Sequence, residues 1–238
     1  MGRLNTSSRT LIVNADDFGL SPGVTRGIIH CFEHGIVTST SFMTRGQSRE
    51  EAAKYARQNP RLSVGLHIDL CEWVVIDGEW STSYEVVSMN DPAAIADEVD
   101  RQLRDFRDLL GRDPSHLDSH QHVHVKDPVR SIMLECAAAL QVPLRHVTNE
   151  ATFVGKFYGQ DQRGRPHPAG ILVPGLIATI SGLPAGVTEL SCHPGFEENL
   201  ASQYCAERVV ELQSLCDPAV REAVEKLEIR LCTFNEIR

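Results

Sequence analysis

LIVNADDFGLSP, residues 11–22, is the stretch from which the fold can be predicted. It begins with an apolar run that ends in Asp16 and Asp17, and Ser21-Pro22 follows as an N-cap and first-turn pair typical of a helix. Apolar residues then recur at helical spacing as far as Gly35, which suits the end of a helix. The stretch therefore predicts a strand, a polar strand end and a helix, in that order.

The same alternation continues along the chain. Further strands are predicted at 36–43, 62–70, 115–119, 144–148, 187–192 and 229–234, and further helices at 50–58, 91–110, 127–140 and 217–226. Strands that alternate with helices favour parallel βαβ units. We therefore expect an α/β fold in a single domain over residues 1–238, a length that suits one α/β barrel, with residues 1–9 as a flexible tail.

Composition excludes several partners. The formal net charge is −9, from 32 acidic and 23 basic residues, and no basic run is present, so nucleic acid and anionic membranes are not expected partners. No apolar run approaches the ~20 residues of a membrane span, and the first residues do not resemble a signal peptide. The seven cysteines form no Cys-x-x-Cys pair. These features together predict reduced thiols and a cytoplasmic protein.

Residues 118–124, DSHQHVH, contain a carboxylate and three imidazoles at alternate positions: Asp118, His120, His122 and His124. In an extended strand these side chains share one face, and both groups are ligands of divalent metals. Alternate residues lie about 6.6 Å apart, whereas metal–nitrogen bonds measure about 2.0–2.1 Å, so all four cannot reach one ion without a sharp bend. Asp118 is therefore expected to orient a histidine, and His122 and His124 to line the pocket.

Polar residues also end three other predicted strands. Asp16 and Asp17 end the first, His67 lies near the end of the 62–70 strand, and His193 follows the 187–192 strand. In a parallel barrel the active site forms at the carboxyl ends of the strands, so these groups are expected to meet in one site. The other histidines have no such context and are expected to be structural or exposed: His30, His34, His116, His146 and His167.

Five motifs carry a family resemblance. They are NADDFGL (14–20), GIVTST (35–40), GLH (65–67), HLDSHQHVH (116–124) and ELSCHPG (189–195). From about residue 11 to the end, the chain resembles the YdjC-like (ChbG/HpnK-type) carbohydrate deacetylases. The resemblance implies an irregular, TIM-like (β/α) barrel of the glycoside hydrolase/deacetylase type. It also implies metal-dependent removal of an acetyl group from an N-acetylated mono- or oligosaccharide, and it allows a homo-oligomer.

The resemblance also implies roles for five residues. Asp17, His67 and His120 would bind one divalent metal ion, Asp16 would be the general base, and His193 would be the general acid. The resemblance favours Mg²⁺, while two imidazoles make Zn²⁺ or another transition metal chemically suitable. Three protein ligands leave coordination positions open for water and a substrate carbonyl, as amide hydrolysis requires.

Two further residues are candidates for the site. The spacing of His120 and His124 is similar to the ligand pair of the larger polysaccharide deacetylase class, so His124 could also be a ligand. Arg145, after another predicted strand, could pair with Asp16.

The sequence also allows two other functions. Another barrel metallohydrolase, such as an amidohydrolase, is expected to have His-x-His in its first strand, where this chain has Asp16 and Asp17. A non-catalytic metal- or sugar-binding protein would have no use for Asp16 or His193. Substrate choice is expected to depend on residues 71–89 and 151–171, whose aromatic side chains could stack on sugar rings: Trp73, Trp80, Phe157 and Tyr158.

Overall fold

A parallel sheet forms the centre of the computed structural model, which describes residues 8–161, 163–197, 200 and 202–237. Within these residues its strands are β1 (Arg9–Phe18), β2 (Ser39–Phe42), β3 (Ser63–Ile68), β6 (Leu117–Ser119), β7 (Thr152–Val154), β8 (Gly186–Cys192) and β9 (Arg230–Leu231). The strand order is β6-β3-β2-β1-β8-β7, and β9 also pairs with β1. Every described pair in this sheet is parallel, as the alternation of strands and helices predicted.

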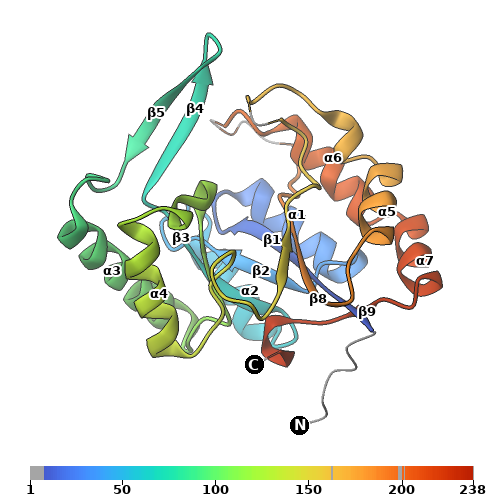
Figure 1. The fold of residues 1–238 in the computed structure, drawn as a ribbon, viewed down its shortest axis with the longest axis horizontal. Coiled ribbons are helices and arrows are strands. Elements are labelled where there is room, and N and C mark those ends of the chain that lie inside the picture. Colours follow the sequence, from blue (N-terminus) through green and yellow to red (C-terminus); the bar gives the residue numbers. More distant parts are fainter. Residues whose placement is uncertain (1–7, 162, 198–199, 201, 238) are drawn as a thin grey trace.

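Helices surround the sheet. They are α1 (Pro22–His34), α2 (Arg49–Gln58), α3 (Pro92–Leu110), α4 (Val129–Leu140), α5 (Val173–Ser181), α6 (Ala206–Leu215) and α7 (Pro218–Lys226). Figure 1 shows α3 and α4 on one side of the strands and α5, α6 and α7 on the other. Ser21, Asp91 and Asp217 cap α1, α3 and α7 by accepting hydrogen bonds from first-turn amides, and the Ser21 cap was predicted from the Ser21-Pro22 pair.

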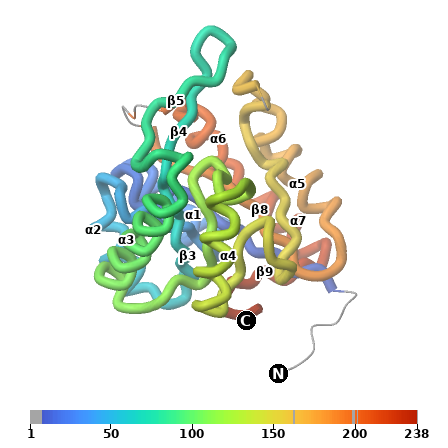
Figure 2. Tube along the Cα trace, turned by 60° about the vertical axis from the view of Figure 1, so that its left-hand side comes forward, coloured from blue at the N-terminus to red at the C-terminus, as the bar shows by residue number. Residues whose placement is uncertain are grey.

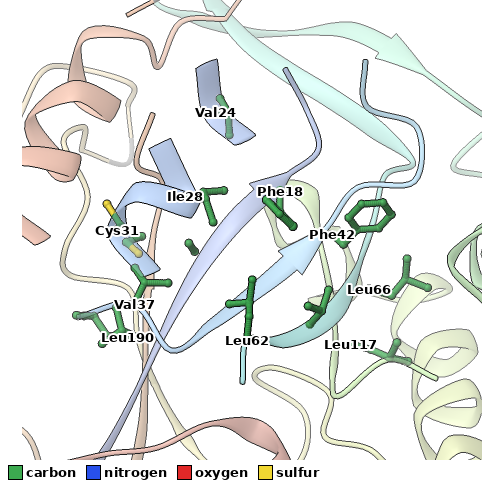
Figure 3. Close-up of a cluster of buried hydrophobic side chains, with 14 of the residues drawn as sticks. Phe18, Val24, Ile28, Cys31, Val37, Phe42, Leu62, Leu66, Leu117 and Leu190 are labelled. Atoms are coloured by element: carbon green, nitrogen blue, oxygen red, sulfur yellow. The ribbon is translucent and has the colours of Figure 1, made fainter. Parts of the chain in front are cut away.

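The hydrophobic core lies between the sheet and these helices. Figure 3 shows Phe18 of β1 close to Ile28 of α1, with Phe42 of β2 and Leu66 of β3 farther along the sheet. The ring of Phe42 meets that of Phe18 edge-on at 6.2 Å and that of Phe106 at 5.9 Å, so β1, β2 and α3 are joined by one aromatic contact series. This packing fixes the strands whose carboxyl ends carry the predicted site residues.

The sheet curls into a half-barrel rather than a closed barrel. Within the described residues, β6 and β7 are the two ends of the strand order, and no ladder joins them. The expected irregular TIM-like barrel is therefore present as an open half-barrel in this part of the chain. The expected tail over residues 1–9 is also corrected, because Arg9 already begins β1; residues 1–7 lie outside the described residues.

Several segments differ from the sequence prediction, which also did not include β7, α5 or α6. The strand expected at 144–148 is wrong: only Leu144 pairs, in an isolated bridge with Leu117, and the amides of Val147 and Thr148 bond back to the carbonyl of Leu144 to close a turn. An antiparallel hairpin of β4 (Cys71–Ile76) and β5 (Glu79–Glu85) was not predicted. In the described residues, no helix is both long and apolar enough to cross a bilayer.

Candidate functional site

The end of β1 brings two consecutive carboxylates to one edge of the sheet. The pairing of β1 with β2 shifts register between Ala15 and Phe18, and Asp17 has the left-handed φ of 71°. A short polar residue tolerates this conformation better than a branched one. Because of the irregularity, Asp16 and Asp17 are both buried at the strand end but contact different partners.

Asp17, His67 and His120 form a cluster of metal-ligand type. Asp17 Oδ1 lies 3.3 Å from Nε2 of His67 and 3.2 Å from Nδ1 of His120, and one donor atom from each residue lies within 4.8 Å of the others. Ligands held about 2.0–2.1 Å from an ion at tetrahedral angles are themselves about 3.3 Å apart. The side chains present therefore fit one divalent cation.

His67 is oriented for this position by Asp118. The carboxylate of Asp118 lies 2.8 Å from His67 Nδ1, which leaves Nε2 directed at Asp17. Such carboxylate–histidine contacts fix the tautomer of metal-binding imidazoles. Burial alone would lower the pKa of His67, but Asp118 and Asp17 raise it to about 10, so the carboxylates favour positive charge at this ring.

Arg208 of α6 holds the other oxygen of Asp17. Its Nη2 donates to Asp17 Oδ2 over 2.6 Å, and both side chains are buried. Burial would raise the pKa of Asp17, but Arg208 and hydrogen bonds from His120 and His67 hold it well below the usual value. Asp17 is therefore an anion with one oxygen fixed by Arg208 and the other directed at the imidazoles.

Arg145 organises the second half of the site. Its buried guanidinium contacts Asp16 at 2.6 Å, Asp118 at 2.8 Å and Glu189 at 2.6 Å. The suggested pairing of Arg145 with Asp16 is thus present, and it is a two-pronged contact. Asp16, His67 and Asp118 form a second cluster of metal-ligand type, but there the cation between Asp16 and Asp118 is Arg145 itself.

The charge of Arg145 sets the ionisation of its neighbours. Burial would raise the pKa of Asp16, but the adjacent guanidinium outweighs burial and lowers it. Burial dominates at Glu189 and raises its pKa to about 7 in spite of Arg145. Asp16 is therefore held as a carboxylate.

His193 faces Asp16 from the end of β8. Its Nε2 lies 3.8 Å from Asp16 Oδ2, and its Nδ1 has no hydrogen-bond partner among the described residues. Burial lowers the pKa of His193 to about 4, so the ring is neutral at pH 7. The backbone amide of His193 donates to Glu211, whose other oxygen accepts from Tyr204.

Backbone contact also fixes the turn that carries His193. A Cβ placed on Gly27 of α1 would lie 2.5 Å from the Cα of Gly195, so these two segments can approach this closely only because residue 27 lacks a side chain. The amide of Gly195 also donates to the carbonyl of Arg208 over 3.1 Å. The turn after β8 is therefore held between α1 and α6.

The histidine strip does not continue as a strand. β6 ends at Ser119, and Gln121 and His122 have left-handed φ angles of 50° and 54° in the turn over His120–Val125. Only His120 reaches the cluster around Asp17. The sharp bend that four ligands would need is present, but it turns the remaining histidines away from that cluster.

The later histidines of the strip have other neighbours. Both ring nitrogens of His124 have partners, Ser119 Oγ at 2.6 Å and the carbonyl of Arg145 at 2.9 Å, so the structure assigns His124 to the support of the Arg145 turn. The His122 ring lies 5.1 Å from that of His146 and 5.3 Å from that of Phe153.

His116 is a core residue, as expected. Its ring stacks on Phe234 at 3.8 Å between centroids, and burial lowers its pKa to about 3. A Cβ on Gly65 would lie 2.4 Å from this ring, which explains why a glycine stands two residues before His67.

Three site residues were missed as functional candidates. Glu189 is a charged residue inside an apolar strand, and that sequence signal could have identified it. Arg208 and Glu211 lie on α6, whose sequence AERVVELQSL is compatible with an ordinary surface helix. Their burial depends on packing that no local pattern reveals.

Comparison with known proteins gives consistent matches over nearly the whole chain. A chitooligosaccharide deacetylase of Yersinia enterocolitica is 32% identical over 250 residues, covering 96% of this chain and 99% of the relative. The crystal structure of an Enterococcus faecalis protein, with a suggested role in cellobiose-phosphate cleavage, superposes with a TM-score of 0.79 at 27% identity, covering 97% and 99% of the two chains.

A more distant structure shares the fold alone. The peptidoglycan deacetylase PdaC of Bacillus subtilis gives a TM-score of 0.56 at 10% identity, covering 98% of this chain and 92% of that one. The family description "YdjC-like protein" matches residues 10–226. The chain therefore belongs to the YdjC-like protein family.

Proposed function

We propose that this chain is a metal-dependent carbohydrate deacetylase that hydrolyses the acetamido group of an N-acetylated sugar or oligosaccharide. The observation that supports this most directly is the position of the Asp16–His193 pair beside the cluster of Asp17, His67 and His120. A relative with 32% identity is named a chitooligosaccharide deacetylase, which supports the same substrate class. We also infer that residues 1–238 act as one catalytic domain on an incomplete barrel.

Asp17, His67 and His120 would hold one divalent ion. The resemblance favours Mg²⁺, and the two imidazoles also suit Zn²⁺. When bound, such an ion polarises the acetyl carbonyl and lowers the pKa of water. Arg208 and Asp118 orient the ligands. Arg208 holds Asp17 Oδ2 and leaves Oδ1 free for the ion, and Asp118 holds His67 Nδ1 and leaves Nε2 free for the ion.

Asp16 accepts the proton of the attacking water. Arg145 keeps it ionised, and Arg145 and Asn14 together fix its orientation, since Asn14 Nδ2 donates to Asp16 Oδ1 over 2.8 Å. The water oxygen forms a bond to the acetyl carbon while its proton passes to the carboxylate. Positioned general bases of this kind typically contribute about 10²–10⁴-fold.

His193 supplies the proton that the leaving nitrogen needs. The water proton taken by Asp16 passes to the neutral His193 ring, whose Nε2 lies 3.8 Å from Asp16 Oδ2, and the imidazolium then donates it to the amine nitrogen as the carbon–nitrogen bond breaks. The second proton of the attacking water leaves with the acetic acid and protonates the released amine at neutral pH, so acetate and an ammonium sugar are formed without net gain or loss of protons.

A non-catalytic sugar- or metal-binding protein is the main competing function. It would need the cluster around Asp17 but gain nothing from Asp16 and His193 set face to face. A carboxylate and an imidazole that face each other beside the metal-ligand cluster therefore favour hydrolysis.

Acetate release tests the proposal. Metal-loaded protein should release acetate from N-acetylglucosamine oligomers, and chelation followed by re-addition of the ion should abolish and restore the release. Asp16→Asn should keep its bound metal, measured by elemental analysis, and lose turnover. If no acetylated saccharide yields acetate with Mg²⁺, Zn²⁺, Mn²⁺ or Co²⁺, the deacetylase proposal is wrong.

A further inference from the structure

The β4–β5 hairpin forms a small sheet of its own that projects from the body of the molecule (Figures 1 and 2). Its turn is Asp77-Gly78, with φ angles of 52° and 83°, as a two-residue type I′ hairpin requires. Both tryptophans of the chain, Trp73 and Trp80, lie on it and are 39% and 53% exposed. Exposed indoles gathered on a projecting element indicate a binding surface.

Two glutamine side chains attach β4 to the loops of the site. The amide of Gln121, the residue directly after His120, accepts from the N–H of Trp73 and donates to its carbonyl, each over 2.8 Å. Gln203 contacts the N–H and carbonyl of Val75 in the same way, at 2.8 and 2.6 Å. Each side-chain amide forms the two backbone hydrogen bonds that a neighbouring strand would form. The turn that carries His120 therefore also positions the hairpin.

Strand pairing places both indoles on one face. Trp73 pairs with Thr82, and Val75 pairs with Trp80, and directly paired residues share a face of a sheet. Trp73 and Trp80 are therefore diagonal neighbours, about 7–8 Å apart at the backbone. Ile76, one residue beyond Val75, lies on the opposite face and is 55% exposed.

The charge of the hairpin narrows the class of ligand. Its sequence over residues 71–85 contains four carboxylates, Glu72, Asp77, Glu79 and Glu85, and no lysine or arginine. This composition does not attract an anionic partner. A neutral sugar ring can lay its C–H face on an indole, and a deacetylated ring carries an ammonium group that both the carboxylates and the indoles attract.

We propose that Trp73 and Trp80 form a stacking surface for the sugar rings that adjoin the ring losing its acetyl group; this rests on the proposed deacetylase function. The surface adjoins the catalytic site because Gln121, the residue directly after His120, holds the backbone of Trp73. The chain accordingly takes an oligosaccharide in preference to a monosaccharide.

Kinetics on oligomers of defined length provide the first test. With the N-acetylglucosamine trimer, Trp73→Ala and Trp80→Ala should each raise KM about three- to tenfold and leave kcat nearly unchanged, because stacking is lost while the reacting groups stay in place. KM for the monosaccharide should not change. Ile76→Ala is the matched control, since it removes an equally exposed side chain from the other face of the same hairpin and should have no effect.

Fluorescence gives a readout that does not depend on turnover. Because the chain has only these two tryptophans, its indole emission reports the hairpin alone. Stopped-flow mixing of metal-loaded protein with the trimer should change the emission saturably before any acetate is released, and the monosaccharide should change it much less.

The outcomes separate this proposal from the deacetylase function. Saturable fluorescence without acetate release would support the stacking surface while the deacetylase function fails. Acetate release with unaltered KM in both tryptophan variants and silent fluorescence would overturn the surface alone. A shift in oligomeric state in Trp80→Ala, seen by size-exclusion chromatography with unchanged KM, would assign the face to a second copy of the chain and equally overturn the proposal.

Discussion

Replacing Arg145 by leucine should leave Asp16, Asp118 and Glu189 buried together without their shared cation. The guanidinium contacts these three carboxylates at 2.6–2.8 Å and is itself fully buried. Removing one partner of a buried ion pair typically costs about 3–5 kcal/mol, because the remaining charge loses its partner without regaining water. In a chain of this size that corresponds to a fall in Tm of about 6–20 °C.

The loss should depend on pH with a definite sign. In the wild-type protein Arg145 lowers the pKa of Asp16 and Asp118, so the stability that it contributes is present above the ordinary carboxyl pKa and is lost as pH falls through the lowered values. In Arg145→Leu the same carboxyls are easier to bury when protonated. The difference in Tm between the two proteins is therefore expected to be largest near pH 7 and to shrink towards pH 4.

Calorimetric unfolding at a fixed metal concentration measures this difference, since bound metal itself shifts Tm. Arg107→Leu is the matched control: Arg107 contacts Asp113 at 2.7 Å, but both side chains are about half exposed, and such pairs contribute under about 1 kcal/mol. A fall in Tm for Arg145→Leu that is no larger than that of Arg107→Leu, or one that does not vary with pH, would refute the reasoning.

Three further changes test the site. Asp16→Asn should lower kcat by about 10²–10⁴-fold at unchanged metal content, and equal loss of metal would instead make Asp16 a ligand. His120→Ala should reduce bound metal in elemental analysis, whereas His124→Ala should not; the reverse result would reassign the ligand set. Burial raises the pKa of Glu211 to about 8, so wild-type stability should fall as pH rises from the ordinary carboxyl value through 8. Glu211→Gln should flatten this fall in thermal unfolding, and identical pH profiles of the two proteins would contradict the buried-acid interpretation.

The principal site residues could be placed from the sequence because each follows an apolar run that ends at the same edge of a parallel sheet. Asp17, His67 and His120 come from β1, β3 and the turn after β6, and a pattern of short strands is enough to bring them to one place. The chemistry of Asp16 beside His193 follows from the same argument.

Other parts of the site depend on tertiary packing that the sequence pattern does not reveal. The alternation of histidines predicted a longer strand, but left-handed Gln121 and His122 end it, and neither residue type demands that conformation. Arg208 reaches Asp17 from a helix far along the chain, and its charge alone would have placed it on the surface. The valine and threonine of the stretch at 144–148 suit a strand, yet Thr148 closes a turn there.

The contact between Gly27 and Gly195 affects how mutants of this enzyme should be interpreted. Position 27 lies on a helix and carries no reactive group. A screen that measures activity alone would nevertheless rank a substitution of Gly27 beside the substitution of a catalytic residue. The methyl group of Gly27→Ala must displace the turn that carries His193, while Asp17, His67 and His120 lie on β1, β3 and the turn after β6. Such a variant is expected to fold, to hold its metal and to turn over poorly, and only metal analysis beside acetate release would distinguish misalignment from missing chemistry.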